Sequence, residues 1–186
     1  MSSSSESSLG RLKGKVAIVT GGASPLGFGF AITRRFIEEG AKVIIGDLDG
    51  SGAESVASSL SSPNVRGVAM DVCNHEDWER VVETAIEEFG GLDIVVNNAG
   101  TTYRNKPTAE VTEDEFERVM SVNVKSIFWS VKTVVPQMQK QGRGGSIINI
   151  SSSGSIRPRP GLVWYNASKG AVSNVSFVKR GLWRVG

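Results

Sequence analysis

The chain has 186 residues, with 21 lysines and arginines against 19 aspartates and glutamates, one histidine and one cysteine. Its net charge of +2 is small and its basic residues are scattered, so we expect no nucleic-acid partner and no anionic membrane partner. A single cysteine excludes an internal disulfide and a cysteine-rich zinc site, which favours a reducing, cytoplasmic setting. No apolar run is long enough to predict a membrane span.

The chain begins with a segment that is too polar to pack. Residues 1–8 contain six serines and one glutamate. This composition lacks both the apolar run of a signal peptide and the arginines of a mitochondrial transit peptide. We therefore predict a disordered serine-rich tail over residues 1–10 and a single domain over residues 11–186.

From Lys15 onward, short apolar runs alternate with longer amphipathic segments, which is the pattern of repeated βα units. Most of the runs are nearly continuous in valine, isoleucine and alanine, as are strands buried on both faces. The predicted fold class is α/β, a three-layer, doubly wound parallel sheet of the Rossmann type. The predicted strands are Val16–Thr20, Lys42–Asp47, Val65–Asp71, Leu92–Asn97 and Ser146–Ser151.

Apolar residues recur at helical spacing between these strands, most clearly from Trp78 to Phe89. A second helix is outlined by residues 31–36 and closed by Gly40. The other predicted helices cover residues 56–60, about 114 to 136, and 165 to about 178.

The first predicted strand runs directly into a glycine-rich turn, and a helix follows. This order places unpaired N–H groups and the positive end of a helix dipole at one point, which suits a pyrophosphate. Glycines are needed because a Cβ would keep the phosphates away from the backbone. Such a loop can also be only a tight turn. The loop residues assigned to a cofactor are Gly21, Ser24, Gly27, Phe28 and Gly29.

Asp47 ends the second predicted strand, 18 residues beyond Gly29. An acidic side chain there can accept hydrogen bonds from the hydroxyls of an adenosine ribose and would repel a 2′-phosphate. Asp47 therefore predicts NAD, with NADP disfavoured, and the adjacent Leu48 is assigned to the cofactor site as well. The alternative is a solvated aspartate in a turn.

Tyr165 and Lys169 lie four residues apart, on one face of the last predicted helix. A free tyrosine titrates at about pH 10, and a nearby ammonium stabilises the phenolate, which suits acid–base chemistry near neutrality. Ser152 follows a strand at the edge where open α/β sheets collect ligands, and its hydroxyl can hold a substrate oxygen. Asn123 interrupts an apolar helix, either as a structural cap or in a proton relay. A surface Tyr–Lys pair is the alternative for the first two residues.

Together these motifs resemble those of the short-chain dehydrogenase/reductase family, from residue 15 to about residue 177. The resemblance implies hydride transfer between C4 of a nicotinamide and the carbon of a small alcohol or ketone. The motifs that carry it are Thr20-Gly21, Asp71-Val72, Asn97-Asn98-Ala99-Gly100, Asn123, Ser152 and Tyr165-x-x-x-Lys169.

The resemblance also implies a role for each matching catalytic residue. Tyr165 would be the general acid/base, and Lys169 would favour its ionised form and hold the nicotinamide ribose. Ser152 would polarise the substrate oxygen, and Asn123 would order a relay water.

For the cofactor, the resemblance implies that Asp71 and Val72 flank the adenine, while Asn98, Ala99 and Gly100 pass beneath the cofactor. Residues 157–172 look most like those of 3-oxoacyl-carrier-protein reductases and of sugar or polyol dehydrogenases. Full-length relatives are expected to be homo-oligomers that pair through the helices containing the catalytic asparagine and tyrosine.

Two features depart from the family pattern. The family loop Thr-Gly-x-x-x-Gly-x-Gly either places Pro25 at its second glycine or carries Pro25-Leu26 as an insertion. We favour the insertion, because proline has no N–H and cannot adopt positive φ, and we expect weakened cofactor affinity. The family fold needs roughly 250 residues, whereas this chain stops 17 residues after Lys169. We expect the last strands and the substrate-covering helices to be missing, which would expose the strand Ser146–Ser151 as an edge.

The leading hypothesis is therefore an NAD-dependent oxidoreductase acting on a small alcohol or carbonyl compound. The alternative is a truncated, catalytically impaired nucleotide-binding fragment of such an enzyme. An interaction module has no sequence feature of its own, since an isolated Cys73 and His75 indicate nothing beyond packing or solvent exposure.

Overall fold

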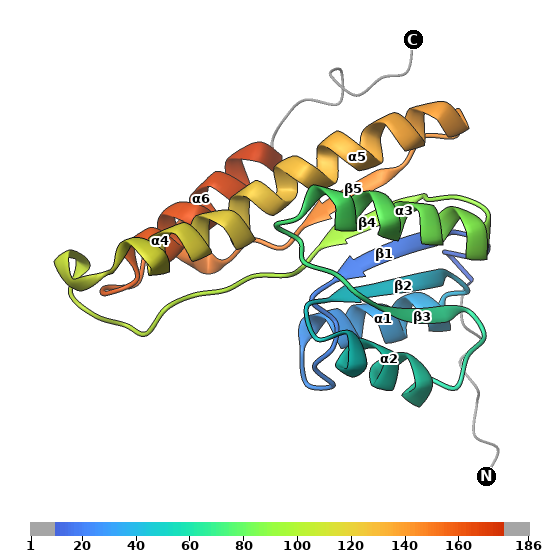
Figure 1. The fold of residues 1–186 in the computed structure, drawn as a ribbon, viewed down its shortest axis with the longest axis horizontal. Coiled ribbons are helices and arrows are strands. Elements are labelled where there is room, and N and C mark those ends of the chain that lie inside the picture. Colours follow the sequence, from blue (N-terminus) through green and yellow to red (C-terminus); the bar gives the residue numbers. More distant parts are fainter. Residues whose placement is uncertain (1–9, 177–186) are drawn as a thin grey trace.

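The computed structural model describes residues 10–176 as a parallel five-stranded sheet covered by helices on both faces (Figure 1). The sheet order is β3-β2-β1-β4-β5, so the chain winds outward from β1 in both directions. This confirms the predicted fold class. Residues 1–9 of the predicted tail and the end of the last predicted helix lie outside the described residues. The strands are β1 Val16–Thr20, β2 Lys42–Asp47, β3 Val65–Ala69, β4 Ile94–Asn97 and β5 Ser146–Asn149.

Two hydrophobic clusters hold the helices on the sheet. Helices α1 (Phe28–Glu38) and α2 (Gly50–Ser59) pack against one face, and α3 (His75–Phe89) and α5 (Ser126–Gln141) pack against the other. Trp78 of α3 is fully buried, and its indole N–H donates to the carbonyl of Val72 at 3.0 Å. Alternate residues of the central strands enter the two clusters, because a strand between two helical layers buries both of its faces.

Three strands are shorter than predicted. β3 ends at Ala69, β4 begins at Ile94 and β5 ends at Asn149. Before β4, the backbone N–H of Leu92 donates to the side chain of Gln141 at 2.8 Å. The Asp93 carboxylate accepts from the backbone N–H of Val16 at 2.9 Å. Before β4, the Gln141 side chain therefore satisfies both backbone groups of Leu92 that a longer strand would have paired.

The predicted helix over residues 114–136 is part of a longer continuous helical segment that contains one π-helical turn. Helix α4 (Glu113–Met120) continues into a π-helical turn, η2 (Ser121–Lys125), and then into α5. The expected end at Pro136 is wrong, because α5 passes through this proline and ends at Gly142, where φ is +70°. The proline leaves the carbonyl of Lys132 without its helical donor, and Lys132 is exposed to water.

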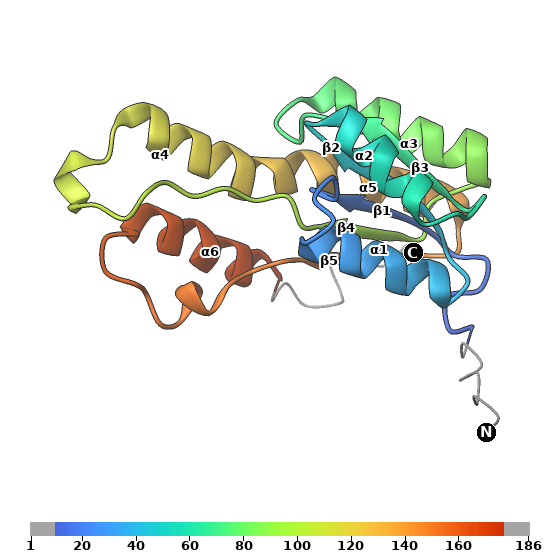
Figure 2. The ribbon, with the colours of Figure 1, turned by 90° about the horizontal axis from the view of Figure 1, so that it is seen from below.

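Helix α6 (Val163–Ser176) begins two residues before the predicted start and lies beside α4, beyond the carboxyl ends of the strands (Figures 1 and 2). The two helices meet where Phe116 and Trp164 pack edge to face, with ring centroids 5.1 Å apart. β5 forms one edge of the sheet, and Ile148 on it is 42% exposed. Among residues 10–176, no strand pairs with the outer side of β5, as expected.

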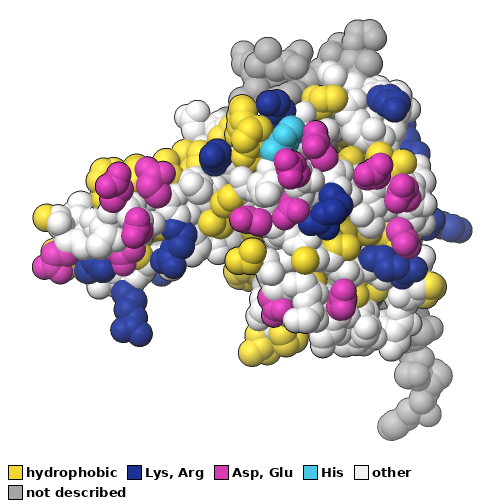
Figure 3. Space-filling model, in the orientation of Figure 1, with side chains coloured by type: hydrophobic (Ala, Val, Ile, Leu, Met, Phe, Trp, Pro, Cys, Tyr) yellow, Lys and Arg dark blue, Asp and Glu magenta, His cyan; other side chains and the backbone are white. Residues whose placement is uncertain are grey.

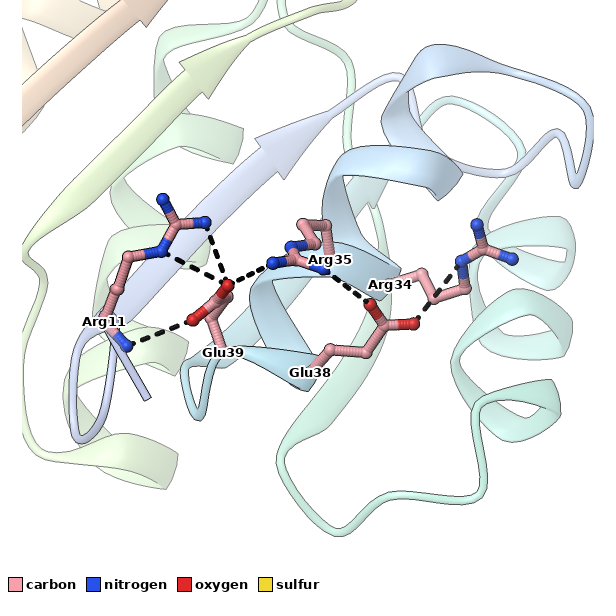
Figure 4. A network of polar contacts seen from close by, with 5 residues as sticks. All are labelled: Arg11, Arg34, Arg35, Glu38 and Glu39. Carbon is pink, nitrogen blue, oxygen red and sulfur yellow. Dashed lines mark hydrogen bonds and ion pairs between the residues drawn. The ribbon is translucent and has the colours of Figure 1, made fainter. Parts of the chain in front are cut away.

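An ionic network fixes the amino-terminal side of the sheet (Figure 4). Glu39 is buried and accepts hydrogen bonds from the backbone N–H and the guanidinium of Arg11, at 3.1 and 2.9 Å, and from Arg35. The hydrogen bond from Arg11 is the main reason that the pKa of Glu39 falls to about 2. The buried charge is therefore compensated, which ties the segment before β1 to the end of α1. Within residues 10–176, no helix is long and apolar enough to cross a membrane.

Candidate active site

The predicted site residues gather along the carboxyl ends of the five strands. The glycine-rich turn follows β1, Asp47 ends β2, Asp71 follows β3, the Asn98 segment follows β4, and Ser152 follows β5. Because all five strands are parallel, these ends share one edge of the sheet, to which α4 and α6 add the remaining side chains (Figure 1).

The glycine-rich turn depends on close backbone approach. Gly21 has φ +71°, and its N–H donates to the carbonyl of Gly46 at 2.8 Å. A Cβ added to Gly21 would lie 2.8 Å from the Cα of Ala99. Gly29, in the first turn of α1, packs so tightly that its Cβ would lie 2.8 Å from the Cα of Gly22. Side chains at Gly21 and Gly29 would therefore push the turn, the helix and the β4 loop apart.

The loop geometry favours the interpretation of Pro25-Leu26 as an insertion. Both residues are exposed, and the Leu26 side chain is 97% exposed. Gly27 is the N-cap of α1, with no side-chain cap, and its N–H donates to the carbonyl of Ser24 at 3.0 Å. The extra residues thus protrude into solvent, while the start of α1 keeps uncapped N–H groups of the kind that bind phosphate.

In this structure the Asp47 carboxylate is hydrogen-bonded to the backbone of the glycine-rich turn. One carboxylate oxygen accepts from the N–H of Ala23 at 2.9 Å, and the other accepts from the N–H of Asp49 at 3.1 Å. Leu48 and Phe28, both assigned to the cofactor, have side chains that are 78% exposed. Asp47 therefore lies beside the turn, with acceptor oxygens that a ribose hydroxyl could reach.

The segment after β4 is tied to the same turn. The Asn98 amide donates to the carbonyls of Thr20 and Gly21, each at 2.8 Å. The Thr20 hydroxyl accepts from the N–H groups of Asn98 and Ala99 at 3.1 and 3.0 Å. Thr20 was not among the predicted site residues. A buried hydroxyl directly before the first loop glycine was the signal that could have identified it.

The end of β3 contributes one exposed carboxylate and one buried side chain. Asp71 is exposed and accepts from the N–H of Cys73 at 2.8 Å, whereas Val72 is only 7% exposed and belongs to the hydrophobic core. Burial, aided by Asp71, raises the pKa of the Cys73 thiol to about 11, so this thiol stays protonated at neutral pH.

His75 has a packing contact of its own. Its ring stacks on Trp129 with centroids 4.6 Å apart, and Figure 3 shows the histidine beside hydrophobic side chains. Among residues 10–176, no group of three or more His, Cys, Asp or Glu side chains is arranged to hold a metal ion.

Asn123 lies in the π-helical turn, is 2% exposed, and uses its whole amide in hydrogen bonds. Its Oδ1 accepts from the N–H of Thr101 at 2.8 Å. Its Nδ2 donates to the carbonyl of Thr101 at 3.0 Å and to the hydroxyl of Ser168 at 2.9 Å. The side chain therefore links the β4 loop to α6, as a structural residue would. The relay role stays a prediction.

The side chains of Lys169 and Asn123 both lie next to Gly100. A Cβ added to Gly100 would lie 3.3 Å from Asn123 Oδ1 and 3.4 Å from Lys169 Nζ. Lys169 is 6% exposed and donates to the carbonyl of Ile150 at 2.8 Å. Its burial lowers the pKa of the ammonium. No carboxylate forms a salt bridge with it among the described residues.

Ser152 and Tyr165 meet across Gly154. A Cβ added to Gly154 would lie 3.4 Å from Ser152 Oγ and 3.7 Å from Tyr165 Cε1. Ser152 Oγ also accepts from the N–H of Gly154 at 3.1 Å, which caps the short helix η3 (Ser153–Ser155). Ser152 Oγ and the Tyr165 ring thus both lie near Gly154, and Asn166 Oδ1 lies closer still, 2.8 Å from the same Cβ position.

An open hollow of about 520 Å³ lies between η3, the segment that follows it, and α6, and neither Ser152 nor Tyr165 is among its lining residues. Its walls include Gly154, Arg159, Asn166 and Gly170. Asn166 Nδ2 donates to the carbonyl of Arg159 at 2.9 Å, while its buried Oδ1 has no partner in the structure. The hollow offers mainly apolar walls with a few polar groups, which is the usual character of a small-molecule site.

Comparison with known proteins places this geometry among dehydrogenases. A family model described as short chain dehydrogenase matches residues 15–179. The chain is 50% identical over 167 residues to 4-formylbenzenesulfonate dehydrogenase TsaC1/TsaC2 of Comamonas testosteroni, covering 89% of this chain and 65% of that protein. It is 42% identical to the NADP-dependent (R)-specific alcohol dehydrogenase of Lentilactobacillus kefiri, again covering 89% and 65%.

Among solved structures, the chain is similar to 3-ketoacyl-(acyl-carrier-protein) reductase from Brucella melitensis complexed with NADH. The TM-score is 0.84 and the identity 40%, covering 88% of this chain and 68% of that one. The chain thus spans about 65% of the length of the curated relatives described above.

Proposed function

The chain belongs to the short-chain dehydrogenase family, and from that premise we propose that it transfers a hydride between a nicotinamide cofactor and a small alcohol or carbonyl compound. The observation that carries this proposal is the convergence of the predicted catalytic residues at one edge of the sheet. The side chains of Ser152 and Tyr165 lie next to Gly154, and those of Asn123 and Lys169 lie next to Gly100.

The cofactor we propose is NAD, held along the carboxyl edge of the sheet. The N–H groups at the start of α1 would hold the pyrophosphate next to Gly21, Gly27 and Gly29. Asp47 would bind the adenosine ribose and repel a 2′-phosphate, which favours NAD over NADP. The remaining contacts would come from Ser24, Phe28, Leu48, Asp71, Val72, Asn98, Ala99 and Gly100.

In the reaction, the bound nicotinamide would accept or supply the hydride. The Tyr165 phenol would give a proton to the substrate oxygen, or take one from it, while Ser152 Oγ donates a hydrogen bond to the same oxygen. The Lys169 ammonium would stabilise the phenolate and bind the nicotinamide ribose. Its burial supports this role, because a charge exerts its effect most strongly where water is excluded.

We propose that a small ketone, aldehyde or alcohol binds with its oxygen at the Ser152 hydroxyl and the Tyr165 phenol, on the face of α6 that carries Lys169. The relatives suggest the range, because their names include a 4-formylbenzenesulfonate dehydrogenase, an alcohol dehydrogenase and a 3-ketoacyl-(acyl-carrier-protein) reductase. The single cysteine supports a reducing, cytoplasmic setting for the enzyme.

The purified 186-residue chain tests the proposal. Absorbance of NADH would be followed with a panel of ketones, aldehydes and polyols, and binding of NADH and ADP would be measured separately. We expect turnover by the wild type and a loss of about 10²–10⁴-fold in Tyr165→Phe, with NADH binding retained in that variant. Equal turnover by Tyr165→Phe would contradict the proposal. Nucleotide binding without turnover by the wild type would instead support the catalytically impaired alternative.

A further inference from the structure

A buried hydroxyl joins the proposed catalytic helix to the rest of the site. Ser168 is 0% exposed and lies one turn along α6 from Tyr165. Its Oγ accepts from Asn123 Nδ2 at 2.9 Å and donates to the carbonyl of Tyr165 at 2.7 Å. The hydroxyl therefore uses its one proton and one of its acceptor sites inside the protein.

This contact completes a chain of directional bonds across three segments. Asn123 in the π-helical turn is fixed to both backbone groups of Thr101, directly after Gly100. Its remaining amide proton goes to Ser168. The β4 loop, the π-helical turn and α6 are thus joined by three hydrogen bonds, and Ser168 is the contact on α6.

The position of α6 decides where the proposed catalytic side chains lie. Lys169, the next residue, has its Nζ 3.4 Å from the place that a Cβ on Gly100 would occupy. Apolar packing alone is not directional, whereas a hydrogen bond weakens steeply when its angle changes. A slide or rotation of α6 would therefore break the bond from Asn123 and move Lys169 away from Gly100.

We propose that Ser168 is a positioning residue, which fixes Tyr165 and Lys169 at the distance from Gly100 that the nicotinamide end of the cofactor needs. The inference rests on the proposed function. Ser168 has no exposed surface, so it would act through Asn123 and Tyr165 and would not touch substrate. Its loss should affect the nicotinamide half of the site and leave the adenosine half intact.

Ser168→Ala tests whether Ser168 affects only the nicotinamide half of the site. We expect kcat to fall about tenfold and NADH to bind about threefold more weakly, the size of effect that lost buried hydrogen bonds produce. ADP should bind as it does to the wild type, because its contacts lie at the glycine-rich turn and Asp47. Ser168→Thr retains a hydroxyl and should restore most of the lost rate. If the alanine variant does not fold, Ser168→Cys offers a side chain of nearly the same size with a weak donor, and the same changes are expected.

The matched control is Ser176→Ala, on the same helix. The Ser176 hydroxyl accepts from Asn149 Nδ2 at 3.1 Å and donates to the carbonyl of Val172 at 2.8 Å, and it is no part of the Asn123 chain. This variant removes one hydroxyl of α6 without altering the proposed positioning. It should bind NADH and turn over as the wild type does.

Three results would overturn the role of Ser168. They are unchanged kcat and NADH affinity in the folded Ser168 variants, an equal loss in Ser176→Ala, or equal weakening of ADP and NADH. A folded wild type that binds neither nucleotide would overturn the proposed function, and the positioning role with it. Binding by the wild type followed by no change in the Ser168 variants would overturn the positioning role alone.

Discussion

The glycine-rich turn and the helix pair α4–α6 are held in different ways. Around the turn, backbone lies on backbone, with Gly21 against Ala99 and Gly29 against Gly22. Phe116 of α4 packs on Trp164 of α6, and Asn123, in the π-helical turn after α4, bonds to Ser168 of α6, so single side-chain contacts hold this region together. The nucleotide end should therefore tolerate no added atom at its glycines. The catalytic end should depend on a few polar groups that small substitutions can remove.

The largest expected effect is a loss of turnover at the catalytic residues of α6, with nucleotide binding at the glycine-rich turn unchanged. Lys169→Met removes the buried ammonium beside Gly100 and should lower turnover about 10²–10⁴-fold, because the phenolate loses its stabilising charge. ADP affinity should not change. Single-turnover rates and ADP titration check this, and a variant that loses ADP binding while folded would show that the two ends are not separate.

The converse test adds one atom to the nucleotide end. In Gly29→Ala the new Cβ would overlap the backbone of Gly22, so α1 must move away from the turn. We expect a loss of about 1–3 kcal/mol in the free energy of unfolding and weaker binding of both ADP and NADH. Urea unfolding and nucleotide titration measure the two effects. As a control, Gly170→Ala on α6 meets no atom within 4 Å and should cost no stability.

A milder change concerns the insertion in the turn. Deleting Pro25 and Leu26 together removes two exposed residues and restores the family spacing between Gly21 and Gly27. We expect NAD to bind about three- to tenfold more tightly, since the shorter loop presents its N–H groups in a more fixed arrangement. Unchanged or weaker affinity in the folded deletion variant would show that the protruding pair does not weaken the site.

The smallest expected effect on function comes from Glu39, which lies away from both the glycine-rich turn and the catalytic residues. Glu39 has a folded pKa of about 2 against an ordinary value of 4.5. Its ionised form therefore stabilises the fold above about pH 4.5, and that contribution is lost as the pH falls towards 2. In Glu39→Gln this component of the acid dependence should disappear, while nucleotide binding at neutral pH stays unchanged. Thermal unfolding between pH 2 and 6 measures it, and an unaltered pH profile would argue against the network in Figure 4.

Local patterns in the chain predicted most of the scaffold. The buried β1 and β2 matched their apolar runs to the residue, because strands with helices on both faces need continuous apolar sequence. The start of β4 was less well predicted, since the Gln141 side chain takes both backbone groups of Leu92. The passage of α5 through Pro136 was also missed, because proline rules describe the local chain and not the packing that carries a helix past it.

By itself, the sequence determined the parallel α/β fold, the glycine-rich turn and the placement of Tyr165 and Lys169 four residues apart on one helix. Each of these follows from spacing within one short segment. Only the tertiary structure decided that the Asn123 amide forms hydrogen bonds with Thr101 and Ser168, and that the Thr20 hydroxyl accepts a hydrogen bond from the Asn98 N–H. These partners lie 22 to 78 residues apart in the chain. Their pairing depends on how parallel strands bring distant loops to one edge of the sheet, which no local pattern encodes.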